Sequence, residues 1–493
     1  MSTTIPQLSR PDFLDGVSSV RGSRETGRDG IIRVNNPATG QQLGEVAAYD
    51  AQQTADRVAS ARLVQPAWAQ ASATQRAEVL SRFHDLMRDN REDLARIMVA
   101  EQGKPLAEAR GEVDYAASFL KWFAEEGRRI YGETIPGPSP DKRIMVLKRP
   151  IGIAAAVTPW NFPAAMITRK VAPALAAGNA IIVKPSELTP FSALALAKLA
   201  LEAGLPEGLF SVVTGHPAAI GSVLTSHPDI GKFSFTGSTA VGKLLAAQCA
   251  TTMKRVSMEL GGNAPLLIFD DANIDEAVDG VMMAKFRNSG QTCVCANRLL
   301  VQDGIHDRFI DALTARVQAL RVGNGLDGVT DQGPLIDKRA VEKISGHVAD
   351  AVGNGARVIT GGSEHGAGSH FWTPTILSHA TEEMRVAHEE SFGPIAPIFR
   401  FTSEADALRL ANATRSGLAA YAFTKDIDRF WRLAEALETG MVGFNTGAIS
   451  SEVAPFGGVK ESGIGREGAH HGIDEYLNLR MICLAVPHQQ SAM

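Results

Sequence analysis

The residue with the clearest chemical potential is Cys293, in the polar segment Gly290-Gln-Thr-Cys-Val-Cys-Ala-Asn297 between a predicted helix and a predicted strand. Reactive cysteines favour loops and helix starts, where the thiolate is stabilised. Glu259 follows another strand-like run, and the two glycines after it would let the backbone approach a ligand closely. Asn161 stands where a strand turns into a helix, so its amide could donate to an oxyanion. These three side chains are the candidate catalytic groups.

A glycine turn at Phe235-Thr-Gly-Ser-Thr-Ala-Val-Gly-Lys-Leu244 follows an apolar strand and opens a helical run. It matches a phosphate loop except at Leu244, which replaces the hydroxyl that would hold Mg²⁺, so an ATP-hydrolysing nucleotidase is disfavoured. Free N–H groups at the helix start could hold a pyrophosphate, although a tight turn without a ligand fits equally. No G-x-G-x-x-G fingerprint is present, so the glycines do not predict a standard Rossmann site.

A second candidate for cofactor binding is the apolar run that ends in Lys184-Pro-Ser-Glu187. A lysine and a carboxylate three residues apart suit a ribose diol, since the carboxylate can accept hydrogen bonds from both hydroxyls. The alternative is a solvated charged turn.

The elements that would position these residues alternate between strand and helix, which predicts βαβ units and parallel sheets. The first such region runs from Ile151 to Asp270 and the second from Ala264 to about Tyr476, while 50–129 is mostly helical. We expect strands at 151–157, 180–184, 210–215, 232–237, 265–269, 298–302, 357–360, 395–399, 419–423 and 441–444, and helices at 163–177, 191–203 and 217–225. A Pro-rich break at 133–141 precedes an extended ribbon.

The bulk composition limits the possible classes of protein. A chain of 493 residues should form two or three structural units, and 44% hydrophobic with 21% charged residues describes an ordinary folded protein. The net charge of −5, without a long basic run, argues against nucleic acid or membrane partners. We see no secretory signal or transmembrane stretch and expect a cytoplasmic protein. The 4 cysteines lack zinc-site spacing, so no metal is expected.

Seven motifs, in chain order, resemble those of the aldehyde dehydrogenase superfamily: TPWNFP, KPSE, FTGST, MELGGN, GQTCVCANR, EESFGP and PFGGVKESGIGREG. The resemblance covers essentially the whole chain, from NNPATG at 35–40 to DEYL at 474–477. Within the superfamily, the segments 167–170, 285–298 and 449–458 are most similar to succinate-semialdehyde dehydrogenases.

The resemblance implies an NAD(P)⁺-dependent aldehyde dehydrogenase in which Cys293 attacks the aldehyde carbon. Asn161 and the Cys293 backbone N–H would hold the oxyanion, and hydride would pass to the nicotinamide to leave a thioester. Sulfur suits this role because it attacks readily and later leaves. Glu259 would then activate water, for which its pKa must be raised by an apolar setting; Leu260 and the adjacent glycines are consistent with that.

The implied fold class is α/β, with two doubly wound parallel-sheet domains and a small β oligomerisation ribbon. We assign 1–131 and 152–262 to a dinucleotide-binding domain, 263–475 to a catalytic domain, and 132–151 with 476–493 to the ribbon. In the family this ribbon builds dimers and tetramers. The apolar runs IMVL and MICLAV suit edge strands that seek partners, so we expect a homodimer or homotetramer.

The resemblance also implies a dinucleotide site, in which Glu390 would hold the nicotinamide ribose. Its residues would be Trp160, Asn161, Lys184, Pro185, Ser186, Glu187, Gly237, Ser238, Leu260, Glu390 and Phe392. The NADP-preferring semialdehyde enzymes tend to have a small residue where this chain has Glu187. A carboxylate near the ribose would repel a 2′-phosphate, which favours NAD⁺, although Lys184 could let NADP⁺ bind too.

Two arginines and a hydroxyl suggest that the substrate carries a carboxylate. If 163–177 is a helix, Arg169 lies roughly 12 Å beyond Asn161 at about 1.5 Å per residue, and its side chain leans back toward the oxyanion site. The resemblance places Arg287 and Ser450 in the substrate funnel, so the three would form a carboxylate clamp. Surface or interdomain ion pairs are the alternative role for either arginine.

The expected substrate is succinate semialdehyde, with glutarate or 2-oxoglutarate semialdehyde as alternatives that differ only in the pocket length they need. A catalytically silent binding or structural protein on the same fold would be expected to lack Cys293, Glu259 or Asn161, and all three are present. Cys295 could form a regulatory disulfide with Cys293, although sulfurs this close in sequence need a strained loop to bond. The alternative for Cys295 is a packed free thiol.

Overall fold

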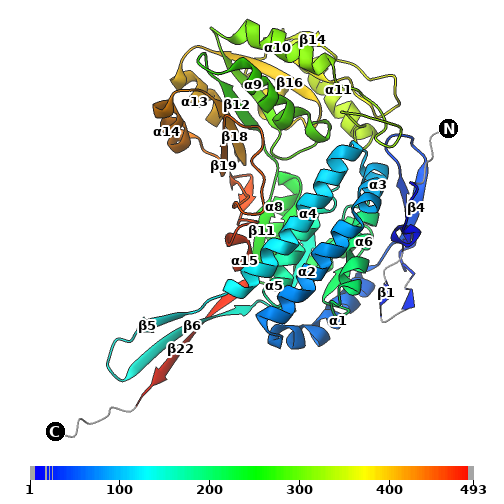
Figure 1. Cartoon of the computed structure of the whole chain (residues 1–493), viewed down its shortest axis with the longest axis vertical. Coiled ribbons are helices and arrows are strands. Elements are labelled where there is room, and N and C mark those ends of the chain that lie inside the picture. Colours follow the sequence, from blue (N-terminus) through cyan, green and yellow to red (C-terminus); the bar gives the residue numbers. More distant parts are fainter. Residues whose placement is uncertain (1–5, 17–18, 21–22, 25, 487–493) are drawn as a thin grey trace.

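The computed structural model describes residues 6–486 except 17, 18, 21, 22 and 25. Two mainly parallel sheets form the centres of two lobes, and a three-stranded ribbon projects from one of them (Figure 1). The predicted α/β class with two parallel-sheet domains and a ribbon is confirmed. The ribbon assignment to residue 493 includes 487–493, which lie outside the described residues.

The first sheet has the strand order β21-β11-β10-β7-β8-β9. Its parallel strands are β7 (Ile153–Val157), β8 (Ala180–Lys184), β9 (Phe210–Val212), β10 (Ile230–Thr236) and β11 (Arg255–Glu259). The strand β21 (Gly463–Ile464) adds an antiparallel edge, although it comes from the segment assigned to the second domain. The chain passes from β7 outward to β8 and β9, then returns to the other side of β7 at β10, so the strand order reverses between β7 and β10.

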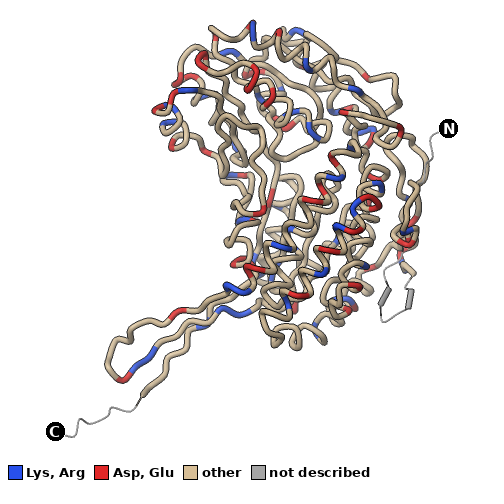
Figure 2. Tube along the Cα trace, viewed as in Figure 1, with Lys and Arg blue, Asp and Glu red and all other residues tan. Residues whose placement is uncertain are grey.

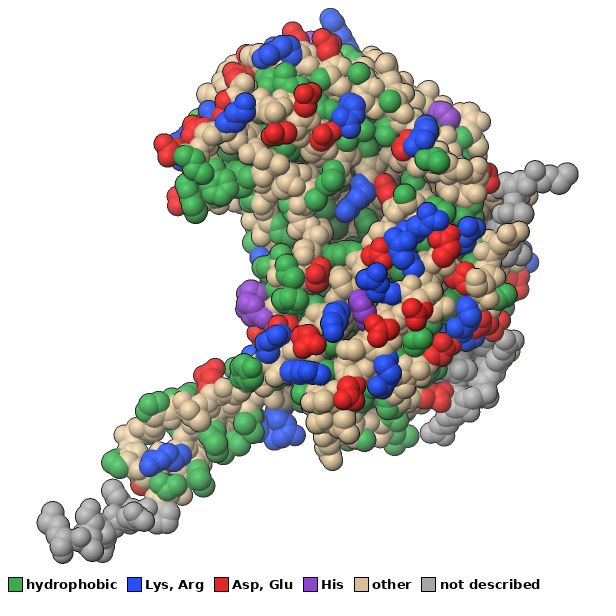
Figure 3. Space-filling view, in the orientation of Figure 1, with side chains coloured by type: hydrophobic (Ala, Val, Ile, Leu, Met, Phe, Trp, Pro, Cys, Tyr) green, Lys and Arg blue, Asp and Glu red, His purple; other side chains and the backbone are tan. Residues whose placement is uncertain are grey.

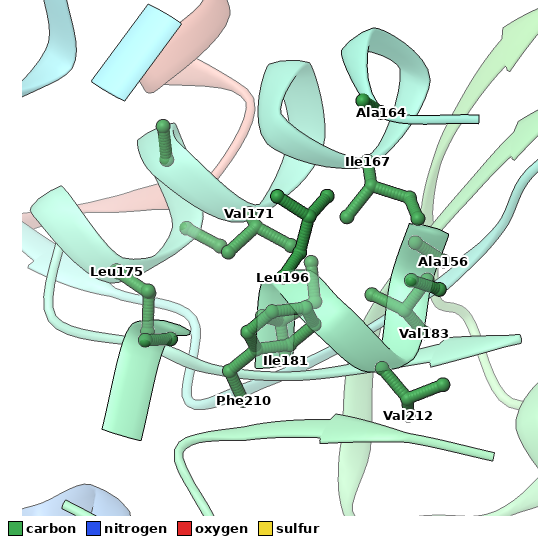
Figure 4. Close-up of a cluster of buried hydrophobic side chains, with 14 of the residues drawn as sticks. Ala156, Ala164, Ile167, Val171, Leu175, Ile181, Val183, Leu196, Phe210 and Val212 are labelled. Atoms are coloured by element: carbon green, nitrogen blue, oxygen red, sulfur yellow. The ribbon is translucent and has the colours of Figure 1, made fainter. Parts of the chain in front are cut away.

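Helices cover this first sheet in two groups. One group consists of α5 (Ala165–Ala176) and α6 (Pro190–Glu202), with α2 (Ala73–Asp89), α3 (Arg91–Gln102) and α4 (Leu106–Glu126) packed on them. Figure 4 shows the core between this layer and the sheet, where Ile167 and Val171 of α5 meet Ile181 and Val183 of β8. The other group is α1 (Ala51–Gln70), α7 (Pro217–Ser226) and α8 (Thr239–Ala250). The mostly helical stretch expected at 50–129 is thus confirmed.

The second sheet has the order β14-β15-β16-β13-β12-β18-β19. Its strands are β12 (Ala264–Ile268), β13 (Ala296–Gln302), β14 (Arg357–Thr360), β15 (Thr375–Ser378), β16 (Ile395–Phe401), β18 (Ala419–Phe423) and β19 (Met441–Phe444). The sequence prediction missed β15, and β14 pairs with it antiparallel at the sheet edge. The longer helices of this lobe are α9 (Ile274–Val281), α10 (His306–Gln318), α11 (Lys338–Gly353), α13 (Glu404–Asn412) and α14 (Ile427–Ala436).

The ribbon consists of β5 (Glu133–Pro136), β6 (Lys142–Pro150) and β22 (Leu477–Ala485), all antiparallel. Apolar side chains remain exposed along it, at Ile135, Leu147, Leu479, Met481 and Leu484 (Figure 3). Charges of both signs alternate over the rest of the chain (Figure 2). Among the described residues, no helix combines the length and hydrophobicity that crossing a membrane requires.

Candidate active site

The reversal of strand order between β7 and β10 places two chain segments at one edge of the first sheet. The segment after β7 carries Asn161, and the segment after β10 carries Gly237 and Ser238. Open α/β sheets bind their ligands at the carboxyl ends of the strands where the order reverses. The fold therefore directs attention to this edge.

A cavity of about 580 Å³ opens at this edge. It is lined by Pro159, Trp160, Asn161, Met166, Leu188, Thr236, Gly237, Ser238, Glu259, Leu260, Gly261, Cys293, Ile336, Asp337, Arg339, Ala340, Lys343, Glu390, Ser391 and Phe392. The three candidate catalytic residues thus come together in one space, although they are far apart in the sequence. Trp160, Gly237, Ser238, Leu260, Glu390 and Phe392 of the expected cofactor site share it.

Unusual backbone conformations occur shortly before Cys293. Asn288 and Ser289 have φ angles of 52° and 54°, and Gly290 has 73°, so three consecutive residues are left-handed. Such conformations cost energy and persist where the surrounding structure enforces them, often at functional sites. Gly262 of the second glycine motif is packed so closely that a Cβ atom there would lie 2.5 Å from the Cys293 carbonyl oxygen. Glycine at position 262 is therefore required for the loop that carries Cys293 to pack against this motif.

Burial dominates the acid–base behaviour of the nucleophile. It raises the pKa of the Cys293 thiol to about 12, although the nearby Arg169 guanidinium acts in the opposite direction. The effect of burial on the pKa is thus larger than the stabilisation of the thiolate expected for a cysteine in a loop. The thiol of the unliganded protein carries its proton at neutral pH, so attack on a carbonyl requires that a base remove it.

Glu259 ends β11 with a fully buried carboxylate. Neither of its oxygens has a hydrogen-bond partner among the described residues. Burial, together with the neighbouring Glu467 carboxylate, raises the pKa of Glu259 well above its usual value, against the opposing effect of Lys170. This is the environment that a carboxylate needs to act as a base near neutral pH.

Asn161 lies in the turn between β7 and α5, and its Nδ2 donates to the Gln291 carbonyl oxygen at 3.0 Å. An amide nitrogen carries two hydrogens, so the second remains available to a ligand in the cavity. This arrangement can donate a hydrogen bond to an oxyanion that forms next to Cys293.

One side of the cavity contains donors and acceptors that fit the pyrophosphate and ribose of a dinucleotide. Ser238 is the N-cap residue of α8, but its side chain accepts no hydrogen bond from the helix. The first N–H groups of this 12-residue helix are therefore available to a pyrophosphate. The Glu390 carboxylate accepts from the Gly262 N–H at 3.2 Å, and burial raises the pKa of Glu390 to about 7. A carboxylate in this position can accept from ribose hydroxyls.

The KPSE segment lies beside this cavity, and none of its four residues lines it. Lys184 donates to the Glu187 carboxylate at 3.1 Å. Burial alone would raise the pKa of Glu187, but Lys184, a backbone hydrogen bond and Arg339 together outweigh it, so this pKa is lowered. Leu188, the next residue, does line the cavity. The assignment of Lys184, Pro185, Ser186 and Glu187 to the cofactor stays a prediction.

The three expected substrate residues have different surroundings. Arg169 is buried, donates to the Tyr115 hydroxyl at 3.0 Å and forms an ion pair with Glu467 at 3.4 Å, and its role toward a substrate stays a prediction. Arg287 is half-buried and lies 5.4 Å from the Phe162 ring centre. It forms no contact ion pair in the described part of the chain, although its charge opposes the rise that burial causes in the pKa of Glu108. Ser450 is half-buried in the loop after β19. The carboxylate clamp stays a prediction. Of its two arginines, Arg287 is the one without an ion pair among the described residues.

Cys295 is a packed thiol in this structure. It is buried, and its Sγ lies 3.3 Å from the Lys285 Nζ. Cys293 is also free, so the regulatory disulfide stays a prediction.

Sequence reasoning missed the part of the cavity that α11 supplies. Ile336, Asp337, Arg339, Ala340 and Lys343 line it from the loop before this helix and from its first turns. The only local signal was Asp337, whose carboxylate caps the helix by accepting from the Ala340 N–H at 2.9 Å. A helix start is a common feature and does not by itself indicate a ligand.

An α/β fold with a buried carboxylate and a cysteine in a cavity at the carboxyl edge of its first sheet suits a thiol-dependent dehydrogenase. A model of the Aldehyde dehydrogenase family matches residues 24–482, and the chain belongs to this family. The expected NAD(P)⁺-dependent aldehyde dehydrogenase, similar to succinate-semialdehyde dehydrogenases, is confirmed.

Close relatives cover almost the whole chain. A 3-sulfolactaldehyde dehydrogenase of Pseudomonas putida is 56% identical over 97% of this chain and 97% of its own length. The NADP(+) succinate-semialdehyde dehydrogenase GabD of Escherichia coli is 55% identical over 92% of this chain and 94% of its own length. The crystal structure of succinate-semialdehyde dehydrogenase from Burkholderia pseudomallei superposes with a TM-score of 0.96 at 54% identity, covering 97% of this chain and 100% of that one.

Proposed function

We propose that this enzyme oxidises a short semialdehyde bearing a carboxylate, with succinate semialdehyde as its preferred substrate. The observation that carries the proposal is the half-buried Arg287 guanidinium, which forms no ion pair among the described residues and, together with Arg169, acts against burial to lower the pKa of the Cys293 thiol. An unpaired cation beside the nucleophile suits an anionic group on the substrate. Relatives that act on small anionic aldehydes support the same class.

In the proposed reaction, Cys293 Sγ bonds to the aldehyde carbon while its proton passes to a base. Asn161 donates its free amide hydrogen to the oxyanion. A bound NAD(P)⁺, held at its pyrophosphate by Ser238 and the α8 N–H groups and at its ribose by Glu390, would accept the hydride from the former aldehyde carbon, which would leave a thioester on Cys293. Glu259 then takes a proton from the water that attacks the thioester, which releases the acid and returns the thiol.

The role of Arg287 is tested by replacing it with Ala. A charge-assisted hydrogen bond contributes about 1.5–3 kcal/mol, so kcat/KM for succinate semialdehyde should fall about 10- to 100-fold. Butanal has the same number of carbons and no carboxylate, and its kcat/KM should change less than about threefold. Steady-state kinetics with both aldehydes measure this, and equal losses for the two would refute the role of Arg287.

The substrate itself is tested with a panel of succinate, glutarate and 2-oxoglutarate semialdehydes, with acetaldehyde and benzaldehyde as neutral references. We expect succinate semialdehyde to have the highest kcat/KM. A higher value for either neutral aldehyde would contradict a carboxylate-binding site. A higher value for glutarate or 2-oxoglutarate semialdehyde would support a carboxylate-binding site but contradict succinate semialdehyde as the preferred substrate.

A second candidate substrate is 3-sulfolactaldehyde, because the relative named for it is 56% identical over 97% of this chain. A sulfonate is also a monoanion with oxygen acceptors, so Arg287 could bind either group. Including this aldehyde in the panel decides between the two anions.

We propose NAD⁺ as the preferred cofactor because of Glu187. Its carboxylate pairs with Lys184 and would repel a 2′-phosphate at the adenosine ribose. Glu187→Ala removes this repulsion and frees the Lys184 ammonium, so the ratio of kcat/KM for NADP⁺ to that for NAD⁺ should rise about tenfold or more. A ratio that stays unchanged would contradict the placement of KPSE at the ribose.

We also propose that the ribbon assembles the chain into dimers or tetramers. Long edge strands with exposed apolar side chains, such as Leu479 and Met481, are a liability unless a partner covers them. Small-angle scattering or sedimentation should therefore give a mass of two or four chains.

A further inference from the structure

The turn that carries Asn161 rests on a buried ion pair that the proposed reaction does not use. Lys104, between α3 and α4, and Glu112, on α4, both have 1% exposed side chains, and Lys104 Nζ lies 2.5 Å from Glu112 Oε2. Lys104 Nζ also donates to the Asn161 carbonyl oxygen at 2.8 Å and lies 4.0 Å from the Phe162 ring centre. One ammonium thus joins α4 to the residue whose amide faces the cavity.

Glu112 holds the other end of the same turn. Its second carboxylate oxygen accepts from the backbone N–H groups of Ala164 at 3.0 Å and Ala165 at 3.2 Å. These are the first N–H groups of α5, a helix without a side-chain cap of its own. Figure 4 shows Ala164 and Ile167 packed in the core, so this end of α5 is seated by apolar contacts as well.

A third contact links the turn to the nucleophile loop. Asn288 donates through Nδ2 to the Asn161 carbonyl oxygen at 3.0 Å and to the Gln291 carbonyl oxygen at 3.1 Å. Gln291 is the residue whose carbonyl also orients the Asn161 amide. The Asn161 carbonyl oxygen therefore accepts from Lys104 and from Asn288, while the Asn161 side-chain amide donates to the Gln291 carbonyl oxygen.

We propose that Lys104 and Glu112 are positioning residues, which aim the Asn161 amide at the oxyanion by holding both ends of its turn. The inference rests on the proposed role of Asn161. If Lys104 and Glu112 served packing alone, apolar side chains of similar volume could replace them, because a buried ion pair adds little or nothing to stability. Here both polar groups also bind the backbone of the turn, which apolar side chains cannot do.

The test uses the full-length enzyme and the double variant Lys104→Met with Glu112→Gln, which leaves no unpaired buried charge. A shift of about 1 Å at a catalytic group costs up to about 100-fold, so kcat should fall at least about tenfold. The KM values for NAD⁺ and for succinate semialdehyde should stay within about threefold. Alkylation of Cys293 by iodoacetamide forms no oxyanion, and its rate should change less than about twofold.

The same double variant in an Asn161→Ala background separates positioning from a general structural role. If the pair acts through Asn161, its removal should lower kcat less than about twofold there. An equal loss in both backgrounds, or no loss with Asn161 present, would overturn the inference. If Asn161→Ala itself leaves kcat unchanged, the proposed oxyanion role fails instead, so the two failures are distinguishable.

Two further variants complete the test. Asp114→Asn is the matched control, because Asp114 lies on the same helix and pairs with Arg91 at 2.7 Å on the surface, and it should leave kcat unchanged. Lys104→Arg replaces the double variant if that protein does not fold, because it keeps a charge paired with Glu112 and changes only the donor to the Asn161 carbonyl oxygen. It should lower kcat at least about threefold, again only when Asn161 is present, and an unchanged kcat would overturn the inference.

Discussion

Replacing Cys293 by Ser is expected to lower kcat for aldehyde oxidation at least about 1,000-fold. Without the nucleophile of a covalent mechanism, only substrate binding and oxyanion stabilisation by the other groups still accelerate the reaction. The hydroxyl is a weaker nucleophile than the thiol at the same position and a poorer leaving group from an ester than sulfur from a thioester. The buried setting that raises the pKa of Cys293 to about 12 disfavours an alkoxide as well. Steady-state production of NADH with succinate semialdehyde measures the loss.

Cofactor binding provides the check that the Cys293→Ser protein is intact. Trp160 lines the cavity, so quenching of its fluorescence by NAD⁺ should be retained. Cys483→Ser is the matched control, because Cys483 is an exposed free cysteine on the ribbon and should leave kcat unchanged. A Cys293→Ser enzyme that keeps its rate would remove the basis of the proposed mechanism.

Replacing Glu259 by Gln is expected to lower kcat about 100- to 10,000-fold by stopping hydrolysis of the thioester. The steps before hydrolysis do not need Glu259 to activate water, so a rapid burst of about one NADH per site should precede the slow turnover. Stopped-flow absorbance shows the burst, and mass spectrometry of the quenched enzyme should find the acyl group on Cys293. An absent burst together with the same loss of kcat would instead make Glu259 the base that deprotonates the thiol.

The raised pKa of Glu259 also sets the pH dependence. Burial and the Glu467 carboxylate disfavour the charged form, so the carboxylate is protonated at pH values where an ordinary glutamate is ionised. A general base must be deprotonated, so kcat of the wild-type enzyme should rise with pH through this raised pKa. The rise should be lost in Glu259→Gln, and a wild-type kcat that is flat from pH 5 to 8 would contradict this role.

Much of the fold followed from local patterns. The strands at 180–184 and 419–423 were predicted with the bounds that the structure has, because buried strands between turn residues leave a strong apolar signal. The more exposed strands at 357–360 and 441–444 were also predicted with their bounds. The strand β15, Thr375–Ser378, was missed although it is buried throughout and has the same length as β14 and β19. The edge strand β21 has two residues and was also beyond reach of a periodic pattern.

The sequence by itself determined the chemistry available to this protein. The thiol at Cys293, the carboxylate at Glu259 and the amide at Asn161 each stand in a motif whose glycines, prolines and strand ends are local features that can be read from residue order. Their types suit covalent chemistry at a carbonyl carbon, and the resemblance of their motifs to the aldehyde dehydrogenases is what implied an aldehyde.

The tertiary structure decided which charges are available to a ligand. Arg169 and Glu467 are separated by 298 residues, yet they form a buried ion pair, and Lys104 reaches Asn161 across 57 residues. Burial then raises the pKa values of Cys293 and Glu259. Pairing and desolvation depend on distances between segments far apart in the chain, and no local pattern of residues encodes those distances.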